Sequence, residues 1–568
     1  MSSQAHGEPG GQPPPCVVFQ DDHLVVTLKP AGWNTHAPAP HAVDGLYDWL
    51  RRSSQWTSLA IVHRLDKETS GLLLFGRSSA ANKGLTAAFT ERRVEKEYTL
   101  LTSRNPLEAA ALAGSRGAVA VSRQGDGWVR VTSHISRRGD TYSCVAPCPG
   151  SQEAVTLFRV TRSGRGHFEL AARPLTGRTH QIRVHAAALG MPILGDVTYG
   201  GEPAWRLFLH ASKLAFTHPV TGEATEFADA LQDAPGDGAR WGIQRAMLRT
   251  EDTDIVRLVH GAPDGAGGRT HVDLLGDTVL IQSERDPAGA EAQGWLGTQP
   301  LGGPPVRRVL AKRLRRDVRV AGAAEDMSPR HVEGEPGEAT FRVRENGVAF
   351  ELRLAEGYSV GLFHDQRENR RALLHNFLGP DFGSILPQRG GEHRPEVLNL
   401  FAYTCGFSVC AALAGARATS LDLSRKYLAW GAANFEHNGI DPAQHDFIYG
   451  DAFDWLARFA RKGRLFDAVM LDPPTFSTCG KGARRFSAEK DFGELAAAAL
   501  GVLKPGGVLF CSTNAARLSP DVFLAAVDDA VAVAGRRISS RQFLTQPPDF
   551  AVPAGEAAYL KSVWCRVD

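Results

Sequence analysis

The first 230 positions alternate between short apolar runs and turn residues. Residues 16–20 (CVVFQ) and 23–29 (HLVVTLK) are rich in β-branched side chains, and two aspartates separate them, so this region predicts a β-hairpin. The residues Lys-Pro-Ala-Gly at 29–32 then end the second strand. More short strands with Gly and Pro turns follow, and residues 79–91 predict a helix. This pattern is typical of a mixed, strand-rich α+β domain over residues 16–230.

Both flanks of this domain are rich in Gly, Pro and polar residues. Residues 1–15 predict a flexible arm, and residues 232–240 (QDAPGDGAR) predict a linker. Residues 241–394 then form a mainly β intermediate region with Gly-rich breaks. Within it, residues 307–319 (RRVLAKRLRRDVR) carry seven Lys or Arg and a single acid. Such a run fits either a solvated helix face or a surface that contacts nucleic-acid phosphates.

The last part of the chain changes to strand–turn–helix repeats. Residues 396–400 and 418–423 predict two strands, each followed by a helix, and residues 466–471 and 508–512 predict two later strands. Strands that alternate with helices form parallel sheets covered on both faces. Residues 395–568 therefore predict a doubly wound, Rossmann-like α/β domain.

Composition is that of a globular protein. The chain has 568 residues, of which 43% are hydrophobic and 22% are charged, and this excludes global disorder. With 64 Lys and Arg against 62 Asp and Glu, the net charge is +2, so the chain as a whole is not a polybasic nucleic-acid binder. No stretch approaches the roughly 20 apolar residues that span a bilayer, so no membrane contact is expected.

Targeting signals and cysteine use indicate the compartment. Residues 1–15 contain neither Lys nor Arg nor an apolar run, which argues against a secretory signal or a transit peptide. The eight cysteines are scattered, so a disulfide framework is excluded and a reducing, cytoplasmic location is expected. Cys144 and Cys148 are spaced like half of a zinc site, but the other half is missing, so no metal is expected.

An aspartate between two cations is the first candidate for chemistry. Residues 63–76 read HRLDKETSGLLLFG, so Asp66 lies between Arg64 and Lys67, just before an apolar strand. Flanking cations favour the ionised carboxylate, and we expect them to lower the pKa of Asp66. By itself, such an aspartate also fits a turn whose side chain caps backbone amides.

Further motifs give this aspartate a context. They are RVEKEYTLL at 93–101, LTGRTHQIRVH at 175–185, PILGDVTYG at 192–200 and RLFLHASKLAFTHPVTGE at 206–223. Their order, together with VFQDDHLVVTLKPAGWNTH near the start, resembles the RluA-type pseudouridine synthases over about residues 16–227. The resemblance implies the pseudouridine synthase fold and RNA as the substrate. It implies no cofactor, because the reaction is an isomerisation.

The same resemblance implies roles for four residues. Asp66 would be the nucleophile that holds the sugar or the base while uracil leaves its ribose through nitrogen and reattaches through carbon. The sequence leaves open whether it adds to the anomeric carbon or to ring carbon 6. Tyr98 would lie against the base and assist the final proton transfer. Arg183 would pair with Asp66 and hold it ionised, and Arg64 would help to fill the space that the flipped nucleotide leaves.

A second set of residues follows the strands predicted within 395–568. The turn FAYTCGF follows the first strand, and small residues there let a ligand approach the backbone. Asp422 ends the second strand, where it can accept hydrogen bonds from ribose hydroxyls, and Asp451 follows the third strand, on the adenine side. Asp472 closes the fourth strand. This order predicts an S-adenosylmethionine site formed by Phe401, Tyr403, Thr404, Gly406, Asp422, Asp451, Asp472 and Pro473.

This half resembles the RlmI and RlmK type of ribosomal RNA methyltransferase. RLVHGAPDGAGGRTHVDLLGD at 257–277 and GYSVGLFHDQRENRR at 357–371 match its upstream segments, so the resemblance covers about residues 255–568. It implies a class I fold, S-adenosylmethionine as the cofactor and large-subunit ribosomal RNA as the partner, with no obligatory protein partner. The family usually has Gly where Cys405 stands, and we expect this thiol to crowd the methionine end of the cofactor.

Residues near the last predicted strand bear on which base atom is methylated. Carbon 5 of cytosine is a poor nucleophile and needs a cysteine that adds to carbon 6, whereas nitrogen 7 of guanine has a free lone pair and needs only placement. In an alignment on Gly506 and Gly507, Asn514 takes the place of the cysteine of the cytosine-modifying relatives, and Cys511 lies three residues before it. DPPTFS and STN resemble the guanine-N7 type more. Guanine-N7 is therefore favoured, and carbon 5 of cytosine is the alternative.

Together these patterns predict one chain with two activities, isomerisation of uridine to pseudouridine and methylation of an RNA base. The region 241–394 is then expected to contact RNA. Two alternatives remain open. One half could be a non-catalytic scaffold that positions RNA for the other half, or the methyltransferase could act on a protein or a small molecule.

Overall fold

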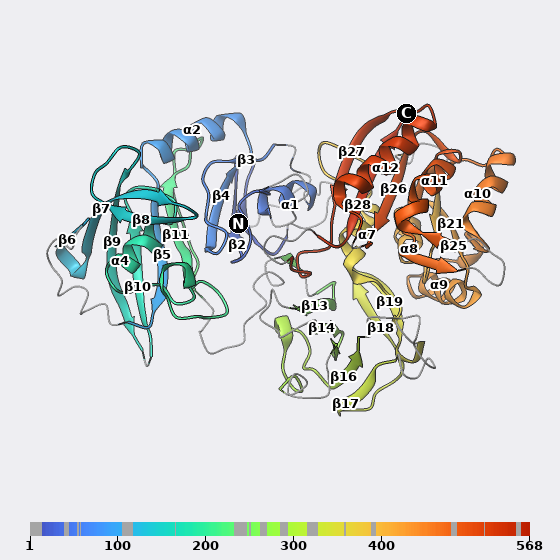
Figure 1. Cartoon of the computed structure of the whole chain (residues 1–568), viewed down its shortest axis with the longest axis horizontal. Coiled ribbons are helices and arrows are strands. Elements are labelled where there is room, and N and C mark those ends of the chain that lie inside the picture. Colours follow the sequence, from blue (N-terminus) through green and yellow to red (C-terminus); the bar gives the residue numbers. More distant parts are fainter. Residues whose placement is uncertain are drawn as a thin grey trace.

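Figure 1 shows the computed structural model of the chain. Most of the predicted arm at 1–15, and the whole predicted linker at 232–240, lie outside the residues that the structure describes. The described residues are 14–38, 45–53, 56, 58–104, 118–164, 166–231, 247–248, 251–261, 270–284, 294–314, 328–356, 359–387, 394–478, 485–515, 517–552 and 558–568.

The N-terminal part forms one mixed sheet, in which the described residues supply 12 strands. The predicted hairpin is its first pair, and the strands follow in the order β1-β2-β4-β11-β5-β10-β9-β7-β6, with β3, β8 and β12 joined to β4, β7 and β11. Their bounds are β1 (Val17–Gln20), β2 (Leu24–Lys29), β3 (Ala60–Ile61), β4 (Ser70–Gly76), β5 (Glu95–Thr102), β6 (Val119–Arg123), β7 (Val129–Arg138), β8 (Thr141–Val145), β9 (Gln152–Ser163), β10 (Phe168–Pro174), β11 (Leu209–Thr217) and β12 (Ala224–Ala228).

Three helices accompany this sheet in the described residues, α1 (Leu46–Ser53), α2 (Ser79–Thr90) and α4 (Gln181–Ala188). The helix predicted at 79–91 is α2, and it begins where the Ser78 side chain accepts a hydrogen bond from the Ala81 amide (3.2 Å). Leu85 of α2 packs against apolar side chains of β2 and β4. Residues of α4 pack instead with β5, β7, β9 and β10, so the two helices support different parts of the sheet.

A smaller sheet follows in the order β13-β14-β15-β16-β17. Its strands are β13 (Ile255–His260), β14 (Thr270–Leu275), β15 (Thr278–Ser283), β16 (Arg308–Arg313) and β17 (Arg330–Gly334), and a hairpin of β18 (Thr340–Glu345) and β19 (Val348–Arg353) comes next. The first part of the basic run 307–319 is therefore strand β16, with Arg308 and Lys312 buried. The described part of the run is therefore a strand and not a solvated helix face. Arg307 and Arg313 are exposed and residues 315–319 lie outside the described residues, so contact with RNA phosphates stays a prediction.

The C-terminal part is the predicted doubly wound fold. A seven-stranded sheet has the order β22-β21-β20-β23-β26-β28-β27, in which the first five strands run parallel and β28 is antiparallel to both of its neighbours, β26 and β27. The strands are β20 (Glu396–Leu400), β21 (Arg417–Asp422), β22 (Asp446–Tyr449), β23 (Phe466–Leu471), β26 (Leu503–Thr513), β27 (Ile538–Leu544) and β28 (Lys561–Val567). A short hairpin, β24 (Phe476–Thr478) with β25 (Arg485–Ser487), lies beside them in sequence.

Side chains alternate between the two faces of this sheet. Val397 belongs to a core with α8 (Gly406–Leu413) and α9 (Arg425–His437), whereas its neighbour Leu398 belongs to a core with α10 (Ala452–Arg461), α11 (Ala488–Leu500) and α12 (Pro520–Val533). Because each face is covered by helices, the central strands β20, β23 and β26 are largely apolar, which is why the sequence predicted them clearly.

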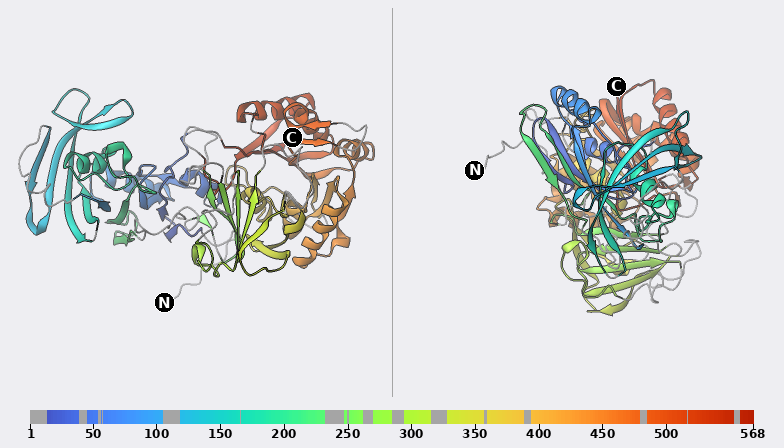
Figure 2. Two further views of the ribbon diagram at one scale, coloured as in Figure 1. Left: turned by 60° about the horizontal axis from the view of Figure 1, so that its bottom comes forward. Right: turned by 90° about the vertical axis from the view of Figure 1, so that its left-hand side faces the viewer.

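The two large sheets lie toward opposite ends of the molecule, with the sheet β13–β17 beside the C-terminal one (Figures 1 and 2). Helix α1 contacts the C-terminal half, where Arg51 pairs with Asp381 across 2.6 Å. Helix α7 (Arg367–Leu374) of the C-terminal half lines a small cavity together with Trp33 and Trp49 of the N-terminal half. No helix in the described part of the chain has the length and apolar character required to cross a membrane.

Candidate active sites

Asp66 lies in the loop between β3 and β4, and the segment 29–35 holds this loop from both sides. The Thr35 hydroxyl donates to the Leu65 carbonyl (3.1 Å) and accepts from the Leu65 amide (3.0 Å). The Gly32 amide donates to the Lys67 carbonyl (2.9 Å). The residues on each side of Asp66 are thereby fixed, so the backbone presents this carboxylate in a defined direction.

Lys29 joins the segment 29–35 to the Asp66 loop. Its buried ammonium donates to the carbonyls of Pro30 (3.0 Å), Trp33 (2.6 Å) and Lys67 (3.0 Å). Burial lowers the pKa of Lys29 to about 7, although the negative charges of Glu68 and Asp66 oppose the shift. The Lys-Pro-Ala-Gly segment that the sequence predicted only as a strand end therefore also positions the Asp66 loop.

The pKa of Asp66 shifts opposite to the prediction. Burial raises it above its usual value, and the positive charges of His180 and Arg183 offset the shift only in part. The flanking residues Arg64 and Lys67 were expected to lower this pKa, but neither is among the groups that shift it. Desolvation of the carboxylate is the largest cause of the shift, so it decides the direction.

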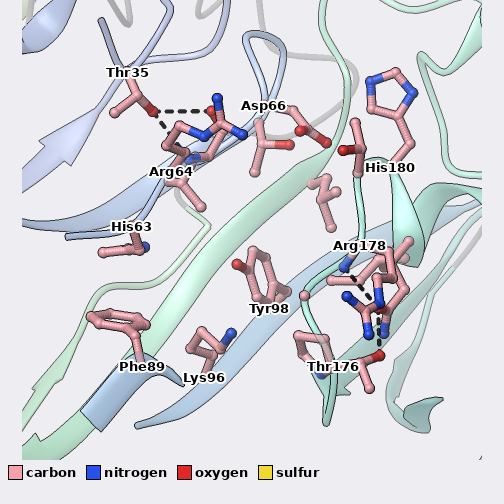
Figure 3. Close-up of a pocket in the computed structure, with 18 of the residues that line it drawn as sticks. Thr35, His63, Arg64, Asp66, Phe89, Lys96, Tyr98, Thr176, Arg178 and His180 are labelled. Atoms are coloured by element: carbon pink, nitrogen blue, oxygen red, sulfur yellow. Dashed lines mark hydrogen bonds between the residues drawn. The ribbon is translucent and has the colours of Figure 1, made fainter. Parts of the chain in front are cut away.

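Tyr98 shares a cleft of about 1050 Å³ with Asp66. The tyrosine is on β5, paired with β10 and β11, and Figure 3 shows Asp66, Tyr98, Lys96 and His180 around this cleft. Burial, and secondly the negative charge of Asp66, raise the pKa of Tyr98 well above its usual value. The phenol is therefore neutral at physiological pH and can donate a proton or a hydrogen bond.

Arg183 does not form the predicted ion pair with Asp66. Its guanidinium instead makes two hydrogen bonds of 2.8 Å to Asp196, and a longer contact of 3.4 Å to Glu68. The Arg183 and Asp196 side chains are 4% and 0% exposed. Arg183 is close enough to lower the pKa of Asp66, so it acts on the carboxylate through its charge, without a direct bond.

Two more pocket residues complete the N-terminal site. Arg64 lines the cleft and is exposed, and its entry into the space that a flipped nucleotide leaves stays a prediction. His180, in a left-handed conformation (φ 55°), contacts the Tyr199 hydroxyl through Nδ1 (2.8 Å). Asp196 and His180 stand in motifs that the sequence analysis quoted, but no role was assigned to them, since only the folded chain shows which charges face Asp66.

In the C-terminal half, a strained turn links β20 to α8. Phe401, Tyr403 and Cys405 all have positive φ (58°, 49° and 64°), a conformation that costs about 1–2 kcal/mol per residue for side chains other than Gly. The turn is held from outside, because the Thr404 hydroxyl donates to the Gly361 carbonyl (2.6 Å) and Asn434 donates to the Thr404 carbonyl (2.9 Å). Stored strain of this kind is typical of ligand sites.

Asp422 stands at the end of β21, next to this turn. Its two carboxylate oxygens accept hydrogen bonds from the amides of Tyr403 (2.9 Å) and Ser424 (2.8 Å). Burial raises the pKa of Asp422, and these backbone donors oppose the shift. Each oxygen keeps a further lone pair, so the carboxylate can also accept from the hydroxyls of a bound ribose.

Asp451 and Asp472 stand at the same edge of the sheet, after β22 and β23. Asp451 caps α10 with one oxygen, which accepts from the amides of Phe453 (2.9 Å) and Asp454 (3.3 Å). Burial, and secondly the charge of Asp365, raise the pKa of Asp472 to about 6. Because the carboxyl ends of adjacent parallel strands meet at one edge, the predicted cofactor residues come together there, with Gly406 as the first residue of α8 and Pro473 buried.

Cys405 is oriented away from the open side of the turn. Its side chain is buried in the core with α8 and α9, and an ideal Cβ on Gly431 would lie 2.3 Å from its sulfur. The thiol therefore packs against α9, and the expectation that it crowds the cofactor stays a prediction.

The described cysteines of the C-terminal half are all buried. Cys511 lies in the sheet core, and burial raises the pKa of its thiol well above the usual value. Asn514, in contrast, is exposed at the end of β26, where it accepts a hydrogen bond from the Thr475 hydroxyl of the DPPT turn (2.8 Å). Cys479 lies outside the described residues.

Comparison with known proteins agrees with this geometry. Residues 23–188 match the RNA pseudouridylate synthase family, and residues 307–566 match the S-adenosylmethionine-dependent methyltransferase family. For each half, a relative that is at least 30% identical is covered by this chain over two thirds or more of its own length. The chain belongs to both families. It is an RNA pseudouridine synthase joined to an S-adenosylmethionine-dependent methyltransferase, and the predicted fold classes and enzyme classes are confirmed.

Individual relatives match one half each. The methyltransferase half is similar to a ribosomal RNA large subunit methyltransferase of Deinococcus radiodurans (31% identity, 61% of this chain and 82% of the relative) and to ribosomal RNA large subunit methyltransferase I of Klebsiella pneumoniae (30%, 57% and 76%). The pseudouridine synthase half is similar to ribosomal large subunit pseudouridine synthase D of Vibrio vulnificus (32%, 38% and 67%).

Proposed function

We propose that the chain isomerises uridine and methylates nitrogen 7 of guanine in large-subunit ribosomal RNA. The names of relatives of both halves support this RNA as the substrate. We assign the pseudouridine synthase to residues 16–230 and the methyltransferase domain to 395–568, with 241–394 as an intermediate region that contacts RNA.

In the pseudouridine synthase half, we assign the nucleophile to Asp66. The observation that supports it is a half-buried carboxylate, in a loop fixed on both sides of it, that faces the same cleft as a neutral tyrosine. Asp66 adds to the target uridine, at the anomeric carbon or at ring carbon 6, and the bond between the anomeric carbon and N1 breaks. The base rotates and rejoins the sugar through carbon 5, and the bond to Asp66 breaks, which restores the carboxylate. The carbon 5 proton leaves to water and N1 takes up a proton, so no proton is gained or lost overall. Tyr98 lies against the base as a neutral hydrogen-bond donor during this proton transfer, and Arg64 enters the space that the flipped nucleotide leaves.

In the methyltransferase half, the residues around the strained turn fit S-adenosylmethionine. Asp422 keeps free lone pairs for the ribose hydroxyls, and the turn from Phe401 to Gly406 exposes backbone next to it. Asp451 would lie on the adenine side, and Asp472 with Pro473 near the methionine end. When bound, the cofactor supplies an activated methyl group, and the protein holds the acceptor in line with it.

Replacing Asp422 with alanine is expected to weaken S-adenosylmethionine binding by about 1–3 kcal/mol, or roughly 5- to 150-fold in Kd. The variant loses the ribose contact and the bond that holds the Tyr403 amide. Isothermal titration of the full chain measures the effect, with Asp529→Asn, an exposed aspartate of α12, as the matched control. An unchanged Kd for Asp422→Ala would mean that the cofactor lies elsewhere.

The burial of every described cysteine of this half supports guanine-N7 over carbon 5 of cytosine. Among the described residues, no thiol of this half is exposed, and Asn514 stands next to the DPPT turn instead. The methylated base can be identified by incubating RNA from cells that lack the chain with labelled S-adenosylmethionine, followed by mass spectrometry of the nucleosides. We expect 7-methylguanosine; 5-methylcytidine in its place would support the alternative.

A further inference from the structure

A further cavity, of about 150 Å³, lies between the sheet β13–β17 and the methyltransferase domain. Its walls come from three separate segments, β13–β16, residues 359–365 and the C-terminal residues 550–559. No role in either activity has been given to it above.

One wall of this cavity is rigid because both carboxylate oxygens of Asp273 accept hydrogen bonds from neighbouring side chains. Its carboxylate pairs with Arg257 and accepts from Gln282 (2.8 Å), while the His364 ring contacts it at 2.9 Å. The Arg257 guanidinium also lies 4.5 Å from the ring centroid of Phe550. The hydrogen-bonding groups of this cluster are already paired with one another, so they hold the wall of the cavity in place. Recognition of a ligand must then come from other residues.

Asp365 is the polar group best placed to meet a ligand here. It lines the cavity and is half-buried, and one of its oxygens accepts from the Tyr559 hydroxyl (3.0 Å). Among the residues that the structure describes, no other donor bonds to this carboxylate. Its remaining lone pairs are therefore available to a donor on the ligand.

The cavity is connected to the methyl-transfer site through the residues around Asp365. The charge of Asp365 acts on Asp472 after β23, and the neighbouring Gln366 donates to the Ser512 hydroxyl on β26 (2.8 Å). On the other side, the ring of Phe363 lies 5.2 Å from that of Tyr403 in the cofactor turn. A group held in the cavity would thus lie next to the edge of the sheet where the cofactor residues meet.

We propose that this cavity holds the acceptor base, and that Asp365 selects it by accepting hydrogen bonds from the N1–H and 2-amino groups of guanine. The proposal deepens the function proposed above and rests on it. Guanine carries these two donors on the edge opposite to N7, so a carboxylate that binds them leaves the N7 lone pair free to face the methyl group. Uracil has no amino group and would leave the carboxylate with fewer partners.

Asp365→Asn tests the carboxylate. The amide has nearly the same shape but exchanges one acceptor for a donor, so kcat/KM for methyl transfer to RNA from cells that lack the chain is expected to fall about 10- to 100-fold. The Kd for S-adenosylmethionine should change less than twofold, and pseudouridine formation by the same preparation should be unchanged. Asp529→Asn is the matched control. Wild-type methylation by Asp365→Asn, or a loss of cofactor binding with it, overturns the proposal.

A second measurement needs no protein variant. Inosine lacks the 2-amino group and keeps N7, so replacing the mapped guanosine by inosine should lower kcat/KM of the wild-type chain about tenfold and should affect Asp365→Asn much less. Equal rates on the two RNAs with the wild-type chain overturn the proposal, even if Asp365→Asn fails to fold. Mapping of the methyl group to a base other than guanine would instead refute the proposed function, so the two failures are distinguishable.

Discussion

Replacing Asp66 with asparagine is expected to abolish pseudouridine formation while methyl transfer by the same molecules continues. The amide is similar in shape but cannot form the covalent bond to the uridine, and loss of a nucleophile lowers turnover by at least about 10⁴-fold. Both products can be measured in one reaction by mass spectrometry of the nucleosides after incubation of unmodified ribosomal RNA with the chain and S-adenosylmethionine.

The control for this experiment is Asp22→Asn, an aspartate exposed in the turn between β1 and β2. It makes the same change of charge in the same half of the chain and should keep both activities. If Asp66→Asn retained pseudouridine formation, the carboxylate would lose the role of nucleophile. If both activities disappeared together, the variant would have damaged the fold.

The second large effect is expected for Arg183→Met. This change leaves the carboxylate of Asp196 fully buried without its cation, which typically costs about 3–5 kcal/mol in stability. It also removes a positive charge that lowers the pKa of Asp66, so pseudouridine formation should fall and its acid limit should move to higher pH. Hydrogen exchange of the amides in α4, compared with those in β20–β23, reports the local loss of stability.

The double variant Arg183→Met with Asp196→Asn separates the two effects. It removes the unpaired charge and should restore much of the exchange protection in α4, whereas pseudouridine formation should stay low. Arg183→Met with unchanged protection would show that the ion pair with Asp196 contributes little. A double variant that recovers activity would show that the charge of Arg183 is not needed near Asp66.

The fold was predictable where one residue pattern dominates. The strands of the C-terminal sheet are buried on both faces, so their runs of apolar residues are long enough to identify. The basic run at 307–319 was misleading as a helix, because Val309, Leu310 and Ala311 separate Arg308 from Lys312 and residues 308–313 enter the sheet as β16. There the guanidinium of Arg308 is satisfied by Thr278 and by backbone carbonyls of residues 336 and 338.

The sequence predicted which residues belong to each site, but it predicted less well which side chains contact one another. Asp66, Tyr98 and Arg183 do come to one cleft or its border, and the predicted cofactor residues come to one edge of a sheet. Partners separated in sequence were missed, because the pairing of Arg183 with Asp196 depends on how α4 lies against the following loop. The direction of the pKa shift of Asp66 depends on burial, which residue spacing does not reveal.

Asp66 is needed for pseudouridine formation in the proposed mechanism, but its burial lowers the free energy of unfolding of the chain. Because its pKa is raised in the native state, this carboxyl still holds its proton at pH values where the unfolded chain has already lost it. The free energy of unfolding therefore falls as pH rises from the usual pKa of the group toward the raised one, and it stays lower at neutral pH. A neutral side chain at this position does not lower the free energy of unfolding in this way. The inactive variant Asp66→Asn should therefore be more stable at neutral pH than the active chain.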